Sequence, residues 1–428
     1  MSKAAAWTQA GNAPPIQLAA RHEIVPGTEA PLAFKALLCL TFIIYIAPQI
    51  IFPVLQPLHL ALVSALFAIC SYLLFVLTSG TRLTVMRPEV KLILGLFALA
   101  VISIPMSEWP GGSFQFLIDQ YYKAIVLFLL VANLLTSDKR LRQLLWAIAI
   151  FTAINGVMGF KAYLNGEFFA ENRVMGGISG ISSNPNDLAL TLNLALPFVW
   201  YLYKSSRSTL QRVATVGITI LSVLTIVITF SRGGFVTLLA LLLWLAAIKF
   251  KEHRGQVIFG GVLLCVGFAF LSPGGYSTRI ISIVDSKQDK TGSGDERWKS
   301  MTAAAQRALA HPLGSGLNMN GVAIESTGLA GVHNVYLEIA VDLGLLALFL
   351  FIRLLWKLYA GMRHLRLTSG DSNLSSLAEA TEGSLVAFAV AAQFHPVSYN
   401  FEFYYLAGIA VAVLEMARRY SLHPERAK

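Results

Sequence analysis

The chain has 428 residues, of which 56% are hydrophobic and only 13% are charged, and its formal net charge is +10. An ordinary soluble domain has about 25% charged residues, so this composition excludes a soluble globular protein. Apolar runs recur almost from end to end, and their length of roughly 14 to 23 residues is close to what a helix needs to cross a bilayer. We therefore expect an all-α, polytopic integral membrane protein.

In chain order, residues 1–35 are rich in Ala, Pro and Gly and are predicted to form an N-terminal tail. Apolar runs bounded by Pro, Gly and charge then predict about twelve transmembrane helices, nine in residues 36–271 and three in residues 333–416. A long loop at 272–332 separates the two groups, and residues 417–428 form a second tail. The predicted spans are Ala36–Val54, Leu60–Leu77, Leu92–Met106, Tyr121–Leu135, Leu141–Tyr163, Leu188–Tyr203, Val213–Phe230, Phe235–Phe250, Val257–Leu271, Val335–Trp356, Leu377–Phe394 and Phe403–Met416.

Lys and Arg gather in alternate loops, for example at Lys139–Arg142 and in the tail at Arg418 and Arg419. By the positive-inside rule these loops are cytoplasmic, and an even number of spans places both termini inside. The net positive charge is then explained by the Lys and Arg of the cytoplasmic loops, and no accompanying motif indicates nucleic-acid binding.

The opposite side has the longer connections. Gly111–Gln120 is predicted as a short interfacial helix, and Asn165–Asp187 as a loop rich in Gly and Asn. Within the long loop, Trp298, Met301, Ala305 and Leu309 fall on one helical face, which predicts an amphipathic helix ending at His311 and Pro312. Because long loops on one side often carry function, we expect the site on this outward face.

Two arginines stand out there because charge near hydrocarbon is costly and is usually retained for a purpose. Arg232 lies in "SRGG" in the tight connection between the seventh and eighth predicted spans, where Gly233 and Gly234 allow a sharp reversal and close approach of backbone N–H groups to an anion. Its alternative role is to bind lipid phosphate as a snorkelling arginine. Arg173 lies in a second outward loop before a similar glycine cluster, and its alternative is an ordinary solvated charge.

The long loop adds Arg279 and Arg297, which have the reach to approach the membrane boundary but are equally compatible with surface ion pairs. His333 follows this loop and opens the tenth predicted span, with Asn334 beside it and Glu338 five residues on. This pattern suits a proton-transfer histidine. Glu338 and Asp342 share one helical face, where they either orient the base or satisfy polar groups of neighbouring helices.

Arginines at an outer boundary, without a cluster of metal ligands in the sequence, suit a diphosphate anchored by a lipid. No metal or cofactor is then expected. If a sugar is linked to that diphosphate, the arginines stabilise the charge of the leaving group, and a base such as His333 deprotonates an acceptor hydroxyl. Attack opposite the leaving group would invert the anomeric carbon.

Three sequence features carry a family resemblance: "SRGG" between two spans, the loop ending "ERWKSMTAAAQRALAHPLGSG", and "HNVYLEIAVDLG" at the entry of the following span. Over about Thr229–Phe351 the chain resembles the O-antigen ligase and polymerase superfamily. His333, Asn334 and Gly344 fit the ligase pattern, whereas Ala347 stands where a small residue or Tyr is expected. The loop "ISSNPNDLAL" also resembles a branch of O-glycosylation ligases.

The resemblance implies a GT-C-like polytopic glycosyltransferase of the bacterial inner membrane, with its active site on the periplasmic face. It would transfer O-antigen from undecaprenyl diphosphate to a hydroxyl of lipid A-core, which completes lipopolysaccharide. Arg232 would bind the donor diphosphate and His333 would activate the acceptor. An O-antigen polymerase and a protein O-oligosaccharyltransferase use the same donor and remain alternatives. A transporter of lipid-linked glycans is an alternative from another class, but it should show broken helices or charges near the membrane midplane.

Overall fold

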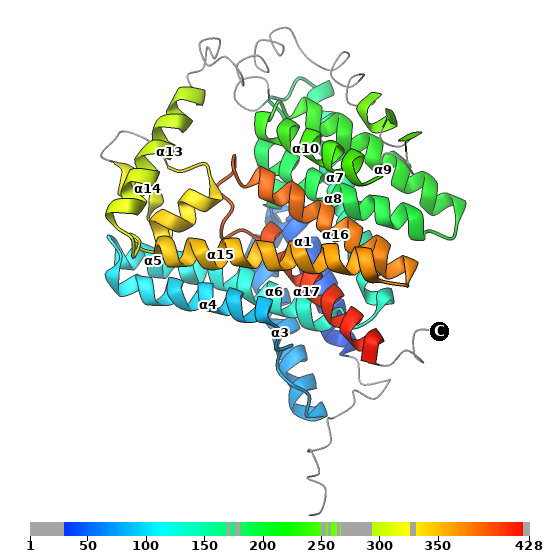
Figure 1. The fold of residues 1–428 in the computed structure, drawn as a ribbon, viewed down its shortest axis with the longest axis horizontal. Helices are drawn as coiled ribbons and strands as arrows, with labels where there is room; N and C mark the ends of the chain where they lie inside the picture. The colour runs from blue at the N-terminus through cyan, green and yellow to red at the C-terminus, as the bar shows by residue number, and fades with distance from the viewer. Residues whose placement is uncertain are drawn as a thin grey trace, which may run out of the picture.

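The computed structural model describes residues 30–168, 173–175, 180–182, 184–249, 254–255, 258–262, 266, 293–325 and 331–422. These residues form helices and connecting loops, with no strand among them (Figure 1). The all-α prediction is therefore confirmed. The helices are α1 (Pro31–Ile46), α2 (Pro48–Ile51), α3 (Leu60–Ser79), α4 (Pro88–Ser103), α5 (Pro110–Phe116), α6 (Tyr122–Leu134), α7 (Asp138–Leu164), α8 (Pro185–Ser205), α9 (Thr209–Ile228), α10 (Arg232–Lys249), α13 (Ser293–Ala310), α14 (Asn320–Ile324), α15 (Val335–Thr368), α16 (Ser372–Ala391) and α17 (Phe401–Leu422).

Six helical segments of the described chain are long and apolar enough to cross a membrane: Pro53–Ser79, Pro88–Met106, Pro110–Leu134, Asp138–Leu164, Thr209–Ile228 and Val335–Thr368. Large apolar side chains lie exposed along several of them, including Leu66, Phe67 and Leu74 on α3. Such an apolar outer surface matches a hydrocarbon environment rather than water. The chain is a polytopic helical membrane protein, while the number twelve stays a prediction, and most of the span predicted at Val257–Leu271 lies outside the described residues.

One predicted connection is wrong. The short interfacial helix expected at Gly111–Gln120 is not separate from the following span, because residues Pro110–Leu134 form one continuous helix. A π-helical turn at Leu117–Tyr121 joins α5 to α6 within it. The turn does not interrupt the helix, so Gly111–Gln120 forms the first turns of a longer helix.

Several helices begin where the sequence supplies a cap or a proline. Asn184, Asn334 and Asp371 accept backbone N–H groups at the starts of α8, α15 and α16. Pro88 and Pro110 occupy the first turns of α4 and α5, where the missing N–H costs nothing. The boundaries of the polar loops are thus set locally by sequence, and this fixes which side chains face each end of the helices.

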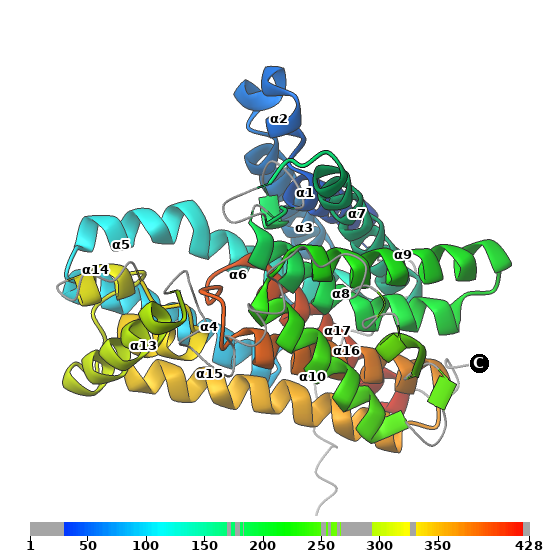
Figure 2. The same cartoon turned by 90° about the horizontal axis from the view of Figure 1, so that it is seen from above.

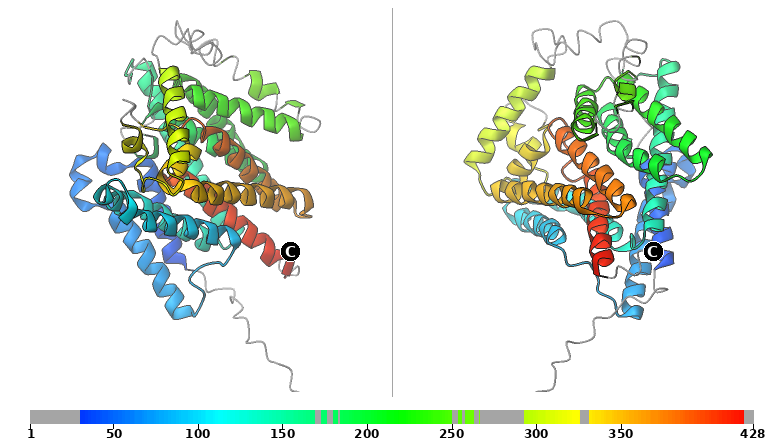
Figure 3. Two further views of the ribbon diagram at one scale, coloured as in Figure 1. Left: turned by 60° about the vertical axis from the view of Figure 1, so that its left-hand side comes forward. Right: turned by 45° about the vertical axis from the view of Figure 1, so that its right-hand side comes forward.

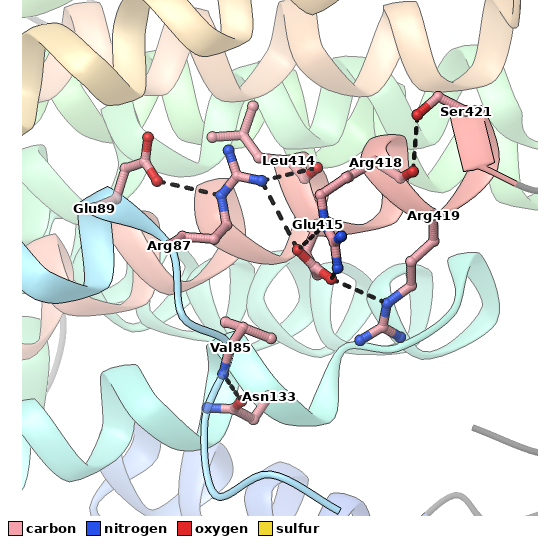
Figure 4. Close-up of polar contacts among 9 residues, drawn as sticks. All are labelled: Val85, Arg87, Glu89, Asn133, Leu414, Glu415, Arg418, Arg419 and Ser421. Atoms are coloured by element: carbon pink, nitrogen blue, oxygen red, sulfur yellow. Dashed lines mark hydrogen bonds and ion pairs between the residues drawn. The ribbon is translucent and has the colours of Figure 1, made fainter. Parts of the chain in front are cut away.

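At one end of the molecule, basic loops from distant parts of the chain come together. Figure 4 shows Arg87 between Glu89 and Glu415, with ion-pair distances of 3.2 Å and 3.8 Å. Glu415 also pairs with Arg418 at 2.6 Å and with Arg419 at 3.3 Å. The loop before α4 and the end of α17 therefore share this side of the protein.

The same end includes the other basic connections. Arg142 donates to the carbonyl of Ser205, and Asn373 donates to Asp138, which also accepts from Tyr420. We call residues 82–89, 138–142, 204–212, 366–379 and 414–420 the basic end. Their convergence is what the alternation of Lys and Arg between loops predicts, while the cytoplasmic assignment of this end stays a prediction.

The opposite end contains α13, α14 and the start of α5, which lie together in Figure 2, far from the connection between α8 and α9. Glu108 donates its backbone N–H to Ser315 O and its side chain pairs with Arg307, while Ser113 donates to Leu317 O. The views in Figure 3 agree with this separation of α13 from the C-terminal end of α17. We call this the site end.

The helix that begins after His333 is broken near its start. At Gly344 the backbone has φ +87°, a conformation that side chains other than glycine rarely adopt. The loop before α14 fills the break: Ser315 N–H donates to Val341 O, Gly316 N–H to Asp342 O, and Leu345 N–H to Pro312 O. The broken turn thus satisfies its backbone groups through the loop at 312–316 and holds that loop on α15.

The amphipathic helix predicted in the long loop exists as α13 and ends at Ala310, but its expected packing face is wrong. Ala304 and Ala308 are buried in a cluster that includes Val341, whereas Trp298 and Leu309 are 71% and 73% exposed. Small side chains allow α13 to lie close to α15, so the larger apolar residues point away from it. The part of the long loop at 271–292 lies outside the described residues.

Candidate functional site

The site starts at the tight connection between α9 and α10. The chain reverses at Phe230, whose φ is +49°, and Ser231 Oγ accepts the N–H of Gly234 at 3.1 Å. A Cβ on Gly234 would lie 2.4 Å from Ala189 Cβ, and one on Gly233 would lie 2.7 Å from Phe394 Cβ. The two glycines therefore allow close packing inside the first turn of α10, which corrects the expectation that they make the reversal and leave N–H groups for an anion.

Arg232 begins α10, and the predicted partner from the second loop lies beside the same turn. Arg173 Nη2 donates to Asn186 Oδ1 at 2.7 Å, and its Nε lies 3.5 Å from Thr229 O. Ser231 Oγ donates to the same Asn186 oxygen at 2.7 Å. Asn186 therefore ties the Arg173 loop to the turn at which Arg232 begins α10.

A residue that the sequence did not single out, His395, extends this cluster. It lies between α16 and α17, with Nδ1 2.9 Å from Ala391 O and Nε2 3.2 Å from Asn186 O. Its Cε1 would lie 3.2 Å from a Cβ on Gly233, next to Arg232. Burial lowers the pKa of His395 to about 4, and the charges of Arg297 and His333 also lower it. A neutral imidazole donates to only one of these two carbonyls, and with either donor the ring holds the loop between α16 and α17 against the backbone at Asn186.

His333 lies within electrostatic reach of the same group. Desolvation lowers the pKa of His333 below its ordinary value, and the positive charge of Arg297 on α13 lowers it further. Part of the side chain remains exposed. A partly exposed imidazole that stays neutral at pH 7 is able to accept a proton from a bound hydroxyl.

Asn334 holds the backbone next to His333. Its Oδ1 accepts from Tyr336 N and Leu337 N at 3.0 Å each, and its Nδ2 donates to Gln393 Oε1 at 3.0 Å. Asn334 is thus the N-cap of α15 and also connects it to the loop that contains His395. A capped helix end bonded to a neighbouring loop restricts the position of the adjacent histidine.

The two acids on α15 organise the surrounding loops. Glu338 is buried and accepts from both the N–H and the Oγ of Ser398. Asp342, also buried, accepts from Asn320 N at 2.6 Å and from Tyr399 OH at 3.0 Å. Asp342 therefore has the structural role, because it satisfies polar groups of neighbouring segments. Glu338 holds the loop at Ser398, and Glu338 and His333 both line one pocket.

The structure thus brings together most of the residues predicted for the site. Arg173, Ser231 next to Arg232, and His395 all contact Asn186, and the charges of Arg297 and His333 act on His395. Arg279 lies outside the described residues. Asn186 and His395 were not singled out. Asn186 lies within "ISSNPNDLAL", which was used only as a resemblance, and the His-Pro pair between two apolar segments was the available signal for His395.

The fold and the site define a polytopic helical membrane protein with a cluster of arginines and a neutral histidine at one end of its helices. Residues 217–352 match the protein-family model described as O-antigen ligase. This segment, which contains Arg232, α13 and His333, is similar to the O-antigen ligase family, and it overlaps the resemblance over Thr229–Phe351. Comparison of the chain with curated proteins finds no match.

Proposed function

We propose that the protein is an inverting, metal-independent O-antigen ligase that transfers a glycan from undecaprenyl diphosphate to a hydroxyl of lipid A-core on the periplasmic face of the inner membrane. The observation that carries this proposal is that Asn186 bonds both Arg173 and Ser231, the neighbour of Arg232, and also contacts His395, on which the charge of His333 acts. The family match over residues 217–352 supports the reaction class.

The arginines suit the donor. A guanidinium binds two phosphate oxygens at once and stays charged at any relevant pH. Arg232 lies in the first turn of α10, where the helix dipole also favours an anion. Arg173, Arg297 and Arg279 are the further candidates to bind the diphosphate, and their positive charge stabilises the leaving group as its C–O bond breaks.

His333 suits the acceptor. Its neutral imidazole takes the proton of the acceptor hydroxyl while the hydroxyl oxygen attacks the anomeric carbon. The bond from that carbon to the phosphate oxygen breaks, and its electron pair leaves with the lipid diphosphate. Asn334 and Glu338 act by positioning, because they fix the start of α15 and the loop at Ser398. Attack from the face opposite the leaving group inverts the configuration.

A reconstitution experiment tests this function. Purified full-length protein in liposomes is given undecaprenyl-diphosphate glycan with lipid A-core, a second lipid-linked glycan or an acceptor protein, each with and without EDTA. We expect lipid A-core to be consumed, at the same rate in both conditions. Consumption of the second glycan lipid alone would identify a polymerase, and loss of transfer in EDTA would contradict the metal-independent mechanism.

The same assay separates the enzyme from a transporter. A transporter of lipid-linked glycans moves its substrate across the bilayer without cutting the sugar–phosphate bond. Released lipid diphosphate in proportion to glycosylated acceptor is therefore expected only from the enzyme. Movement of intact donor without release would refute the proposal.

A further inference from the structure

A polar pocket of about 300 Å³ opens beside His333. Its lining comes from the π-helical turn before α6, the loop that ends at Asn320, the start of α15 and the loop before α17. Glu338 and Tyr399 are buried, whereas His333 is exposed and stands where the pocket reaches the surface. Among the described residues that line it, none of the arginines of the site takes part.

We propose that this pocket binds the sugar that accepts the glycan, with Gln120 and Asn400 as the residues that recognise its hydroxyl groups. The inference rests on the proposed function and adds the pocket and the residues that would recognise the acceptor. His333 then stands between two chemically different compartments: the arginines hold an anion on one side, and amides hold a neutral, hydroxyl-rich ring on the other.

The chemistry of the lining favours a sugar. Side-chain amides offer both donors and acceptors, as sugar hydroxyls do. Gln120 Nε2 donates to Asn400 Oδ1 at 2.8 Å, so the two amides form one rigid pair across the pocket. Phe116 and Tyr399, with ring centroids 5.6 Å apart, supply an apolar surface for the C–H face of a ring. A diphosphate would call for guanidinium groups instead.

The pocket is also held in shape before any ligand binds. Tyr399 OH and Asn320 N both donate to Asp342, and Asn320 Oδ1 accepts from Val332 N at 3.2 Å. Gln120 lies in the π-helical turn Leu117–Tyr121, a local irregularity that often occurs at functional sites. Preorganised polar groups lower the ordering cost of binding.

Size and polarity separate a sugar from a protein acceptor. A volume of about 300 Å³ is at the lower end for small-molecule pockets, which suits one sugar ring with its neighbours outside. A serine or threonine side chain has a single hydroxyl and would leave the remaining donors and acceptors of the two amides without a ligand group to bind. The pocket therefore predicts a glycolipid acceptor rather than a protein.

The test uses the variants Asn400→Leu and Gln120→Leu in the reconstituted full-length protein, with initial rates measured against lipid A-core and against donor. We expect the acceptor KM to rise about tenfold, the factor for losing one to two hydrogen bonds, with a donor KM within about twofold of wild type. Asn165→Leu is the matched control, because Asn165 is an exposed amide whose Nδ2 donates to Glu167 outside the pocket. It should change neither value.

The outcomes distinguish this inference from the function on which it rests. If wild type transfers to no acceptor, the proposed function fails. If wild type transfers to lipid A-core but both leucine variants keep its acceptor KM, only the pocket assignment fails. A peptide acceptor that binds in competition with lipid A-core and loses affinity in Asn400→Leu would overturn the sugar assignment. The conservative variant Gln120→Asn keeps the amide and controls for a loss of activity that comes from misfolding. We expect a smaller rise in acceptor KM for Gln120→Asn than for Gln120→Leu.

Discussion

Arginines at the basic end and Arg173 near the connection between α9 and α10 are held by different kinds of partner. At the basic end, cations meet carboxylates on neighbouring helices: Arg366 pairs with Glu382 at 2.6 Å, and Lys204 lies 3.3 Å from Glu379. Arg173 is held by an amide oxygen and a backbone carbonyl. At the basic end carboxylates hold the cations and connect two helices, whereas at Asn186 neutral oxygens fix the direction of a guanidinium beside the connection between α9 and α10.

The sharpest way to break this comparison is to remove the base at the site end. We expect His333→Ala to lower kcat by about 10²- to 10⁴-fold, the contribution of a general base, while the protein still folds and inserts. Turnover with purified donor and lipid A-core measures the effect, and gel filtration with thermal unfolding checks the fold. His364→Ala, on the exposed surface of α15 toward the basic end, is the matched control and should keep wild-type turnover.

The second effect compares one arginine from each end. Arg232→Lys should weaken donor binding by about tenfold or more, because a point charge cannot reproduce the two-pronged contact of a guanidinium with phosphate. Arg418→Lys at the basic end should change donor affinity by less than about twofold, since it replaces one exposed cation beside Glu415 with another. Direct binding of lipid-linked donor measures both; equal losses would show that the site end has no special role.

The sequence was sufficient for the helical fold and for the grouping of basic loops, because both follow from hydrophobic periodicity and charge, which act locally. It also indicated Arg232 and His333 through their places at helix boundaries. It did not indicate that Asn186 and His395 connect these residues, because that contact joins segments 209 positions apart. Nor did it indicate which face of α13 packs against the protein. The burial of Ala304 and Ala308 depends on the position of α15, which the sequence pattern does not give.

A third prediction concerns the broken turn that holds the outward loop on α15. A Cβ on Gly344 would lie 2.4 Å from Pro312 O at a φ of +87°, so Gly344→Ala is strained both locally and against the loop. We expect a loss of about 1–3 kcal/mol of stability from the backbone conformation, and more if the loop is displaced. Thermal unfolding in detergent measures it. Gly370→Ala, with open space around its Cβ, is the control, and equal midpoints would contradict the role of the break.

The smallest effect tests the electrostatic link between Arg297 and His333. A general base works in its neutral form, so a lowered pKa keeps His333 active to a lower pH than an ordinary histidine, and transfer should fall as acid protonates it. Arg297→Gln removes a positive charge that disfavours the imidazolium, so the pKa of His333 should rise and the acidic limb of the rate profile should move to higher pH. Lys299→Gln, an exposed neighbour on α13, should leave the limb in place. An unmoved limb in Arg297→Gln, with the rate merely scaled down, would mean that Arg297 acts on the donor alone and that the histidine owes its lowered pKa to desolvation.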